Sequence, residues 1–160
     1  MLQLTRRTEY GLIALVHMVD REGEPVSVRE LGERYRVPKR LLAEVLKDLC
    51  RSELVESHRG ASGGYCLARR PEEITLGDVV GALEGAPHLI RCQVPALLRE
   101  SSNCDFQPTC PIRSPIQHVH ERLLELLERT TLRSLAEAPA RSLAEAQEGR
   151  GASLSASASP

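Results

Sequence analysis

The chain has 160 residues and a mass of 17.7 kDa, with 41% hydrophobic residues and a formal net charge of −1. This length suits one domain, or one small domain with an added arm, and the apolar content is sufficient to bury a core. The near-zero charge disfavours a nucleic-acid binder held by positive charge spread over the whole chain.

The beginning of the chain lacks the uninterrupted apolar segment of a signal peptide, and no stretch approaches the roughly 20 apolar residues of a membrane span. We therefore expect a cytoplasmic protein. In that compartment an odd number of Cys, here five, indicates metal, cluster or redox chemistry more than a disulfide framework.

The charge is divided unevenly along the chain. Residues 1–70 hold 13 basic and 10 acidic side chains, whereas residues 71–160 hold 8 basic and 12 acidic ones. The first half is therefore net basic and the second net acidic, which indicates that the two halves have different tasks.

The first predicted elements are three helices. Apolar periodicity predicts a helix over residues 5–20 that is apolar on most sides and therefore buried. Ser27 and Glu30 have the spacing of a capping box, which opens a short second helix. Pro38 is placed to open a third helix. Its apolar stripe consists of Leu41, Leu42, Val45, Leu46 and Leu49.

Beyond the third helix the period changes. Residues 54–68 suit two short strands around the glycine-rich turn 60–64, which predicts a β-hairpin. Thr75 and Asp78 then have the spacing of a second capping box, opening a fourth helix that runs to about Glu84.

The second half of the chain is predicted to hold a loop, a long helix and a tail. Residues 86–111 have no regular period and carry three Cys, which indicates a structured loop. A long helix is predicted from Ile112 to about Ser134, with a near-heptad apolar stripe that requires a partner, most simply a second copy. Residues 139–160 are rich in Ala, Ser, Gly and Pro and are predicted to be disordered.

Together these elements predict a mainly helical fold with a small β-hairpin wing: a winged helix-turn-helix plus a long dimerisation helix. The predicted organisation is a winged helix-turn-helix DNA-binding domain over 1–85, a cysteine-bearing loop over 86–111, a dimerisation helix over 112–138 and a disordered tail over 139–160.

The amphipathic third helix is interpreted as a DNA recognition helix. Its outward face presents Lys39, Arg40, Ala43, Glu44 and Lys47, which fit a major groove. The start of the second helix and the wing add Ser27, Arg59, Ser62, Gly63 and Gly64. A mixed-charge helix alone is more often a solvated face, and the glycine-rich wing favours DNA binding because glycines allow close approach to phosphate. Glu44 could accept from cytosine N4, but a surface charge is the preferred interpretation.

Three cysteines of the predicted loop form the second candidate site. Cys92, Cys104 and Cys110 are separated by 11 and 5 residues, and three soft ligands suit an iron–sulfur cluster or zinc. A reduced, inert loop or a Cys104–Cys110 redox pair are the alternatives. Candidates for a fourth ligand are His88, Asp105, His118, His120 and, at a distance, Glu9. Cys50 and Cys66 are expected to be core residues.

No catalytic site is predicted. The sequence offers no nucleophile–base–orienter set, and the glycines of 60–64 join two strands and so do not form a phosphate-cradling loop before a helix. We therefore expect a protein that is not an enzyme.

Four segments resemble the winged-helix iron–sulfur and nitric-oxide-responsive regulators of the IscR and NsrR type, the Rrf family of bacterial transcription factors. The resemblance covers residues 2–134. The segments are Leu4-Thr5 with Glu9-Tyr10; Val37-Pro38-x-x-Leu41-Leu42; Leu54-Val55-x-Ser57-x-Arg59-Gly60-x-x-Gly63-Gly64-Tyr65-x-Leu67; and Ile74-Thr75-Leu76-Gly77-Asp78-Val79-Val80 with Cys110-Pro111-Ile112.

The resemblance implies a homodimer that binds a partly palindromic double-stranded DNA operator and senses iron–sulfur status, nitric oxide or redox state. Cluster-binding members use three Cys of this loop, here Cys92, Cys104 and Cys110, to hold a 2Fe–2S or 4Fe–4S cluster. IscR-like members have a His three residues after the third Cys, where this chain has Arg113. NsrR-like members use a carboxylate from the first helix of the other subunit, which implies Glu9 of the partner subunit here. The alternative is a cluster-free member regulated by thiol oxidation, structural zinc or a partner protein.

Overall fold

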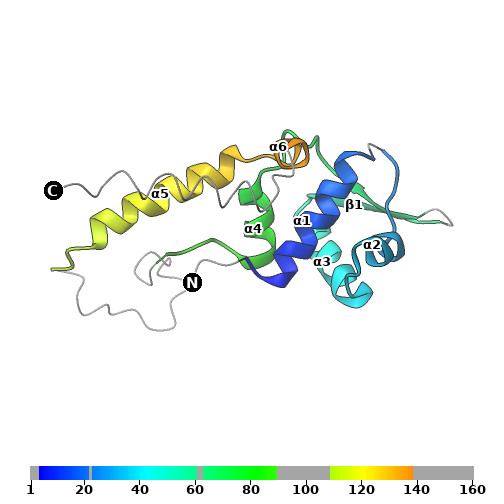
Figure 1. Ribbon diagram of the computed structural model, residues 1–160, viewed down its shortest axis with the longest axis horizontal. Coiled ribbons are helices and arrows are strands. Elements are labelled where there is room, and N and C mark those ends of the chain that lie inside the picture. The colour runs from blue at the N-terminus through cyan, green and yellow to red at the C-terminus, as the bar shows by residue number, and fades with distance from the viewer. Residues whose placement is uncertain (1–3, 22, 61–62, 90–108, 139–160) are drawn as a thin grey trace, which may run out of the picture.

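The computed structural model describes residues 4–21, 23–60, 63–89 and 109–138 (Figure 1). Its elements in chain order are α1 (Arg6–Val19), α2 (Val28–Tyr35), α3 (Lys39–Arg51), β1 (Val55–His58), β2 (Gly64–Leu67), α4 (Leu76–Glu84), α5 (Arg113–Arg129) and α6 (Leu132–Glu137). The prediction of a mainly helical fold with a small antiparallel hairpin is confirmed. The predicted tail over 139–160 lies outside the described residues.

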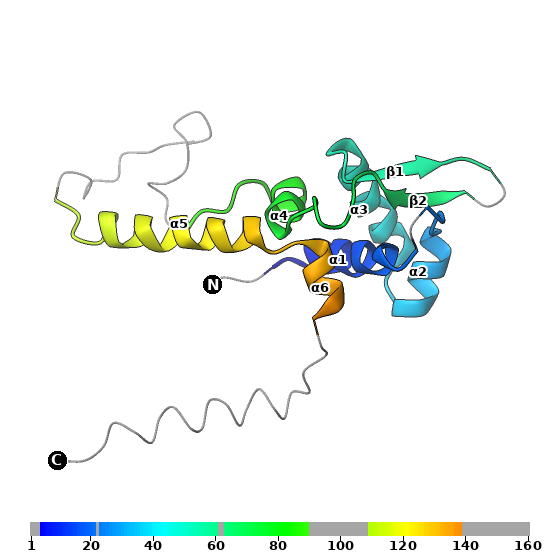
Figure 2. The ribbon, with the colours of Figure 1, turned by 90° about the horizontal axis from the view of Figure 1, so that it is seen from above.

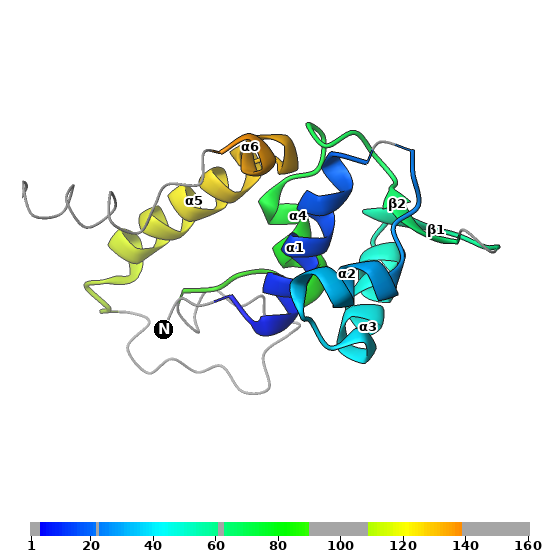
Figure 3. The same ribbon diagram turned by 45° about the vertical axis from the view of Figure 1, so that its right-hand side comes forward.

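The first three helices pack around one apolar core, with α3 in contact with both α1 and α2 (Figure 3). Thr5 begins α1, because its side chain accepts a hydrogen bond from the backbone N–H of Thr8. Most of the predicted apolar faces of α1 are buried, but Ile13 remains 36% exposed. The largest fully buried core side chains include Leu15, Leu31, Leu42, Leu46, Leu49, Leu54, Ile74 and Leu132.

A tight turn joins α2 to α3. Arg36 in this turn adopts a left-handed φ of 54°. A Cβ added to Gly32 would lie 2.7 Å from Cγ of Lys39 and 3.2 Å from the Val37 carbonyl oxygen, so glycine gives the start of α3 room to pack closely against α2. Pro38 occupies the N-cap, and α3 begins one residue later than predicted.

The hairpin is fixed to the helical head at its base. β1 and β2 pair antiparallel, with Val55 opposite Leu67. Val26, in the segment that connects α1 to α2, forms a further bridge with Tyr65 through two backbone hydrogen bonds of 2.9 Å. From this base the two strands project away from the head (Figure 2).

Only one of the two predicted capping boxes is complete. Thr75 and Asp78 exchange two hydrogen bonds of 3.0 Å at the start of α4, as predicted. Ser27 accepts from the Glu30 N–H at 3.1 Å, but the Glu30 carboxylate does not return to the Ser27 backbone. It accepts from the Arg21 guanidinium at 3.1 Å instead, because a cation is a stronger partner than a backbone amide.

The prediction of one continuous helix from residue 112 to about 134 is wrong. The structure has two helices there: α5 ends at Arg129, and α6 begins after Thr131, whose side chain caps it.

The break between α5 and α6 is caused by backbone pairing with a distant segment. The Leu76 N–H donates to the Thr130 carbonyl at 2.7 Å, and the Leu132 N–H donates to the Ile74 carbonyl at 2.9 Å. These bonds hold the chain extended at Thr130 and seat Leu132, which is completely buried, in the core of the head. As a result α6 packs against α1.

In contrast to α6, α5 extends from the head on the side opposite the hairpin (Figure 2). None of its residues is buried, although it contacts α4. Ile112, Val119 and Leu126 remain 54%, 53% and 61% exposed along its apolar stripe. No helix in the described ranges is long and apolar enough to span a membrane.

Candidate nucleic-acid interface and cysteine site

The outward face of α3 carries the predicted DNA contacts as an exposed row. The Arg40 side chain is 95% exposed, and its Nε lies 3.6 Å from Oε1 of Glu44 one turn later. Lys47 is exposed and Ala43 half-buried. Glu44 is therefore an exposed carboxylate beside Arg40 in the free protein.

Lys39, at the start of the same face, is tied back to α2. Its Nζ donates to Oε1 of Glu33 at 2.9 Å, and the same oxygen accepts from Nε of Arg29 at 3.1 Å. The hydrogen bond from Lys39 is the main reason why the pKa of Glu33 is lowered from its ordinary value. Lys39 thus links the two helices of the helix-turn-helix.

The described part of the wing brings one cation and two structurally required glycines together. Arg59 is exposed after β1. A Cβ on Gly64 would lie 2.5 Å from the Val26 carbonyl oxygen, and a Cβ on Gly63 would lie 2.6 Å from that of His58. These two glycines therefore allow close contacts within the chain itself. Ser62, also predicted to contact DNA, lies outside the described residues.

Ser27 lies half-buried at the start of α2, where its hydroxyl oxygen accepts from the Glu30 N–H. The hydroxyl oxygen is thus partly engaged in capping α2. The Val26–Tyr65 bridge holds the start of α2 beside the base of the wing. A residue in this position can present a backbone N–H or hydroxyl to a phosphate.

The structure describes one of the three predicted cysteine ligands. Cys110 is a half-buried free thiol directly before α5. Cys92 and Cys104 lie outside the described residues. Within the described part of the chain, no group of three His, Cys, Asp or Glu side chains is placed to hold a metal ion.

The remaining two cysteines belong to the head. Cys66 is 6% exposed, and burial raises the pKa of its thiol, which makes it an unreactive core residue as predicted. Cys50 is half-buried and packs against the core from α3.

Glu9, the predicted carboxylate ligand, lies in the first turn of α1. It is partly exposed and accepts from Arg6 at 3.2 Å. Around it, α1 is fixed by two contacts. The Thr5 N–H and the Thr8 hydroxyl both donate to the Glu84 carboxylate at the end of α4, and Arg7 donates to Asp48 of α3.

A family model described as an iron-dependent transcriptional regulator, Rrf2, matches residues 4–138 of the chain. The chain belongs to the Rrf2 family. This confirms the resemblance drawn from the four sequence segments and, with it, the assignment of the hairpin as the wing of a winged-helix regulator.

Individual relatives agree with the Rrf2 assignment. The regulator NsrR of Shouchella clausii is 30% identical over 135 residues, which cover 84% of this chain and 88% of the relative. The structure of CymR, the global cysteine regulator of B. subtilis, is 27% identical with a TM-score of 0.66, covering 85% of this chain and 97% of that one. For IscR of T. potens the identity is 28% and the TM-score 0.61, with coverage of 93% and 91%. These relatives are transcriptional regulators and not enzymes, so the chain is not an enzyme, as predicted.

Three positions that hold this Rrf2 head together were missed by the sequence reasoning. Gly32 permits the helix-turn-helix to close, and a glycine inside a predicted helix is the signal that pointed to it. His17 is 8% exposed and lies 3.1 Å from the Tyr35 hydroxyl, which joins α1 to α2. The ion pair of Arg7 with Asp48 has no sequence signal, because the two residues are far apart in the chain.

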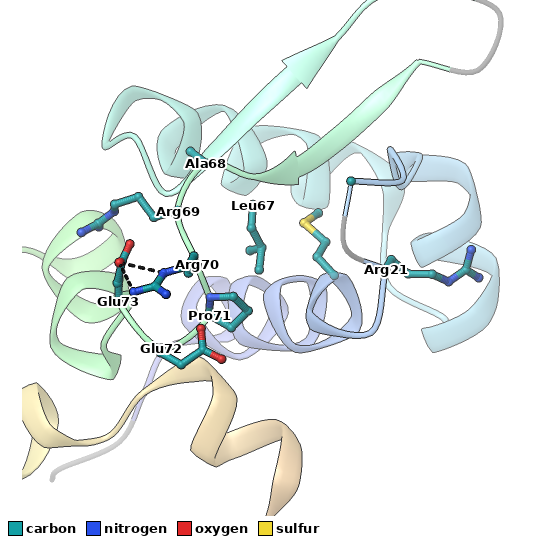
Figure 4. A pocket seen from close by; sticks show the side chains of 10 residues that line it. Arg21, Leu67, Ala68, Arg69, Arg70, Pro71, Glu72 and Glu73 are labelled. Atoms are coloured by element: carbon teal, nitrogen blue, oxygen red, sulfur yellow. Dashed lines mark hydrogen bonds and ion pairs between the residues drawn. The ribbon is translucent and has the colours of Figure 1, made fainter.

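A shallow pocket of about 520 Å³ lies beside the end of β2 (Figure 4). Its cations are already paired. Arg70 donates to Glu73 at 2.7 Å and 2.9 Å, and Arg69 lies 3.5 Å from Asp78. Arg21 on its other side is paired with Glu30. The pocket therefore offers no free charge among its lining residues to select a ligand.

The contact between Glu84 and α1 gives a testable pH dependence. The hydrogen bond from Thr8 is the main reason why the pKa of Glu84 is lowered below 4.5. We expect Glu84→Ala to reduce the free energy of unfolding at pH 7 by about 1 kcal/mol, because Thr8 is buried and would lose its acceptor while solvent screens the charge. Because the folded-state pKa is lowered, this stabilisation is present above about pH 4.5 and is lost as the pH falls below it.

Urea unfolding of the wild type and Glu84→Ala at several pH values measures this effect. Thr8→Val removes the donor in nearly the same shape, so the double variant should lose no more stability than Glu84→Ala alone. Additive losses in the double variant would show that the two side chains do not interact.

Proposed function

We propose that this Rrf2-family chain is a homodimeric repressor or activator that binds an operator in double-stranded DNA through α3 and the wing, under the control of an iron–sulfur cluster. The observation that carries this proposal is that the molecule has two separate exposed surfaces of different chemistry, one basic and one apolar. The basic face of α3 and the wing form one, and the unburied apolar stripe of α5 forms the other.

The DNA-binding part of the proposal rests on α3 and the wing. Arg40 and Lys47 are exposed on one side of α3, and Arg59 is exposed on the hairpin that projects from the same head. This geometry supports docking with α3 in a major groove and the wing along the adjacent phosphate backbone of the DNA. Because Glu44 pairs with Arg40, binding to phosphate requires Arg40 to exchange that partner.

The dimer part rests on α5. A helix of 17 residues with no buried side chain has only marginal stability on its own. Packing of its apolar stripe against a partner would supply the missing stabilisation. A two-fold pairing of two α5 helices would bury Val119 and Leu126 of both chains. It would also place two recognition helices on one operator.

The cluster part rests on the donor set. Three thiolates from Cys92, Cys104 and Cys110 with one carboxylate suit an iron–sulfur cluster, and the N-terminus of α5 beside Cys110 favours an anionic group. Within one chain, α5 leads away from the head, so its start, which follows Cys110, lies apart from α1, the helix that carries Glu9 (Figures 1 and 2). This separation supports Glu9 of the partner subunit as the fourth ligand.

The contacts around Glu9 suggest how a change in the cluster would alter DNA binding. A cluster bound in this way would supply a redox- and nitric-oxide-sensitive bond to α1. Arg7, two residues before Glu9, pairs with Asp48, and Asp48 follows Lys47 on the recognition helix. A shift of the first turn of α1 therefore displaces the end of α3 that lies beside a predicted DNA contact.

DNA binding is tested on α3. We expect Arg40→Ala and Lys47→Ala each to weaken operator binding and to make the slope of log affinity against log salt less steep by about two units, because each removes one phosphate contact from each subunit of the proposed dimer. Arg51→Ala is the matched control, since Arg51 lies at the far end of α3 and pairs with Asp48 at 2.7 Å. Fluorescence anisotropy over a salt series measures both quantities. An unchanged slope in the two test variants would exclude α3 as the phosphate-binding helix.

The cluster is tested by anaerobic purification with iron and sulfide analysis. We expect a coloured protein whose DNA affinity changes when the cluster is lost. Cys110→Ser should remove the cluster, and Glu9→Ala should alter its absorption spectrum and its DNA response. Asp20→Ala, which removes a carboxylate at the other end of α1, should leave both unchanged. Wild-type spectra and DNA response in Glu9→Ala would refute the ligand assignment.

A cluster-free regulator is the second candidate function. It is favoured by the similarity to a structure of the oxidized form of Staphylococcus aureus CymR, which is 25% identical with a TM-score of 0.64. A colourless anaerobic preparation whose DNA binding changes on thiol oxidation would establish this candidate, and bound zinc would indicate a structural site.

A further inference from the structure

Two histidines from separate segments face each other beside α5. His88 follows α4, and His120 lies near the middle of α5. Their ring centroids are 6.4 Å apart, and the ring planes are 28° from parallel. In each ring the Nδ1 atom is buried and has no hydrogen-bond partner. These are the two buried side-chain nitrogens that lack a partner in the described part of the chain.

An imidazole nitrogen that is removed from water without a partner costs free energy, and here two occur side by side. A neutral imidazole carries its proton on one ring nitrogen and a lone pair on the other, and in the tautomer with the lone pair on Nδ1 of both rings the two nitrogens are acceptors that cannot satisfy each other. A group that accepts both lone pairs at once removes the cost of both. Neutral imidazole nitrogens that converge are ligands for divalent transition-metal ions such as Zn²⁺, Cu²⁺, Ni²⁺ and Fe²⁺.

The distance between the rings is close to what such an ion requires. A metal ion binds each imidazole nitrogen at about 2.0–2.1 Å, so its centre lies about 3 Å from each ring centre, and two rings that share it at a tetrahedral angle are about 5 Å apart. The observed centroid distance is 6.4 Å. The two rings would therefore approach each other by about 1 Å and turn their Nδ1 atoms toward one ion on binding.

We propose that His88 and His120 form a binding site for a divalent transition-metal ion that prefers imidazole ligands, separate from the cysteine set. Two protein ligands leave the other coordination positions to water, so the ion exchanges with the solution in the manner of an open site. Bound there, it joins the segment after α4 to the middle of α5 and restricts their relative movement. The site uses no cysteine, so a test of metal binding by the two histidines does not depend on whether the proposed cluster is present.

Zn²⁺ binding to the full chain tests the proposal. The three thiols of the proposed cluster site are removed by Cys92→Ser, Cys104→Ser and Cys110→Ser, so that they cannot bind the titrated ion, while Cys50 and Cys66 remain in the head. Isothermal titration with Zn²⁺ should then give one site per chain, and Co²⁺ should give the absorption of a nitrogen- and oxygen-liganded ion without thiolate bands. His88→Gln and His120→Gln should each weaken Zn²⁺ binding at least tenfold.

The matched control is His118→Gln. His118 is two residues from His120 on the same helix, but its side chain is 66% exposed, and its Nδ1 lies 3.9 Å from Glu121. This variant should bind Zn²⁺ like the parent. Circular dichroism of the metal-free variants checks that each is folded, and a rise of the unfolding temperature with Zn²⁺ concentration, absent in His88→Gln, is a second readout.

Two results overturn the site. The first is a folded triple-serine chain that takes up no Zn²⁺, and it would assign the buried nitrogens to a bridging water instead. The second is equal weakening by His118→Gln and His120→Gln, which would show binding by exposed histidines in general. Neither result affects the DNA-binding or cluster proposals, because those are measured with different residues and a different ion.

Discussion

Glutamate in place of Val119 and Leu126 is expected to convert the proposed dimer into monomers and to weaken operator binding by at least about a hundredfold. Both side chains are more than half exposed in the single chain, so the change should leave the fold of the monomer intact. In a dimer the four introduced carboxylates would face one another across the two-fold axis without partners. The loss of affinity follows because each monomer retains only one recognition helix, and the gain from linking two sites disappears.

Analytical ultracentrifugation and anisotropy with an operator duplex measure the two effects together. Glu121→Gln with Glu128→Gln is the matched control, because these residues lie on the opposite side of α5 and keep its length and helical propensity. A dimer that persists in Val119→Glu/Leu126→Glu would place the subunit interface elsewhere on the molecule.

Leu132→Ala is expected to have the largest effect on stability, a loss of about 2–5 kcal/mol in the free energy of unfolding. Leu132 is completely buried in the core of the head, although it is separated by tens of residues from its neighbours there. It is also the residue whose N–H bonds to the Ile74 carbonyl. Its loss leaves a cavity and weakens the attachment of α6 to the head.

Urea unfolding followed by circular dichroism measures the loss. Leu135→Ala, on the same short helix but only partly buried, is the control and should lose clearly less. Equal losses in the two variants would mean that α6 contributes as a loosely packed helix and does not anchor the chain through Leu132.

The features that sequence predicted correctly are those set by residues close together in the chain. The capping box of Thr75 and Asp78, the hairpin and the apolar stripe of α3 are local patterns, and the structure contains all three. The same holds for the exposed face of α3, because it is the complement of its buried stripe.

The features that could not be predicted depend on competition with distant partners. The hydrophobic period continues through Thr130, yet the helix stops there because the backbone pairs with Ile74 and Leu76. Glu30 has the right spacing to complete a capping box, but Arg21 provides a better partner. The pairing of His88 with His120 has the same origin, since it depends on how α5 lies against α4.

Because α5 is attached to the head at its junction with α6, a small rotation there moves the opposite end of α5 over a larger distance. The start of α5, which follows Cys110, is about 25 Å from the paired backbone at Thr130, and a tilt of 10° about that point moves the start of the helix by about 4 Å. On the other side of Thr130, α6 packs against α1, the helix that carries Glu9. In the proposed dimer, small rotations between the two α5 helices would therefore alter the separation of the recognition helices, which must match one turn of DNA, about 34 Å.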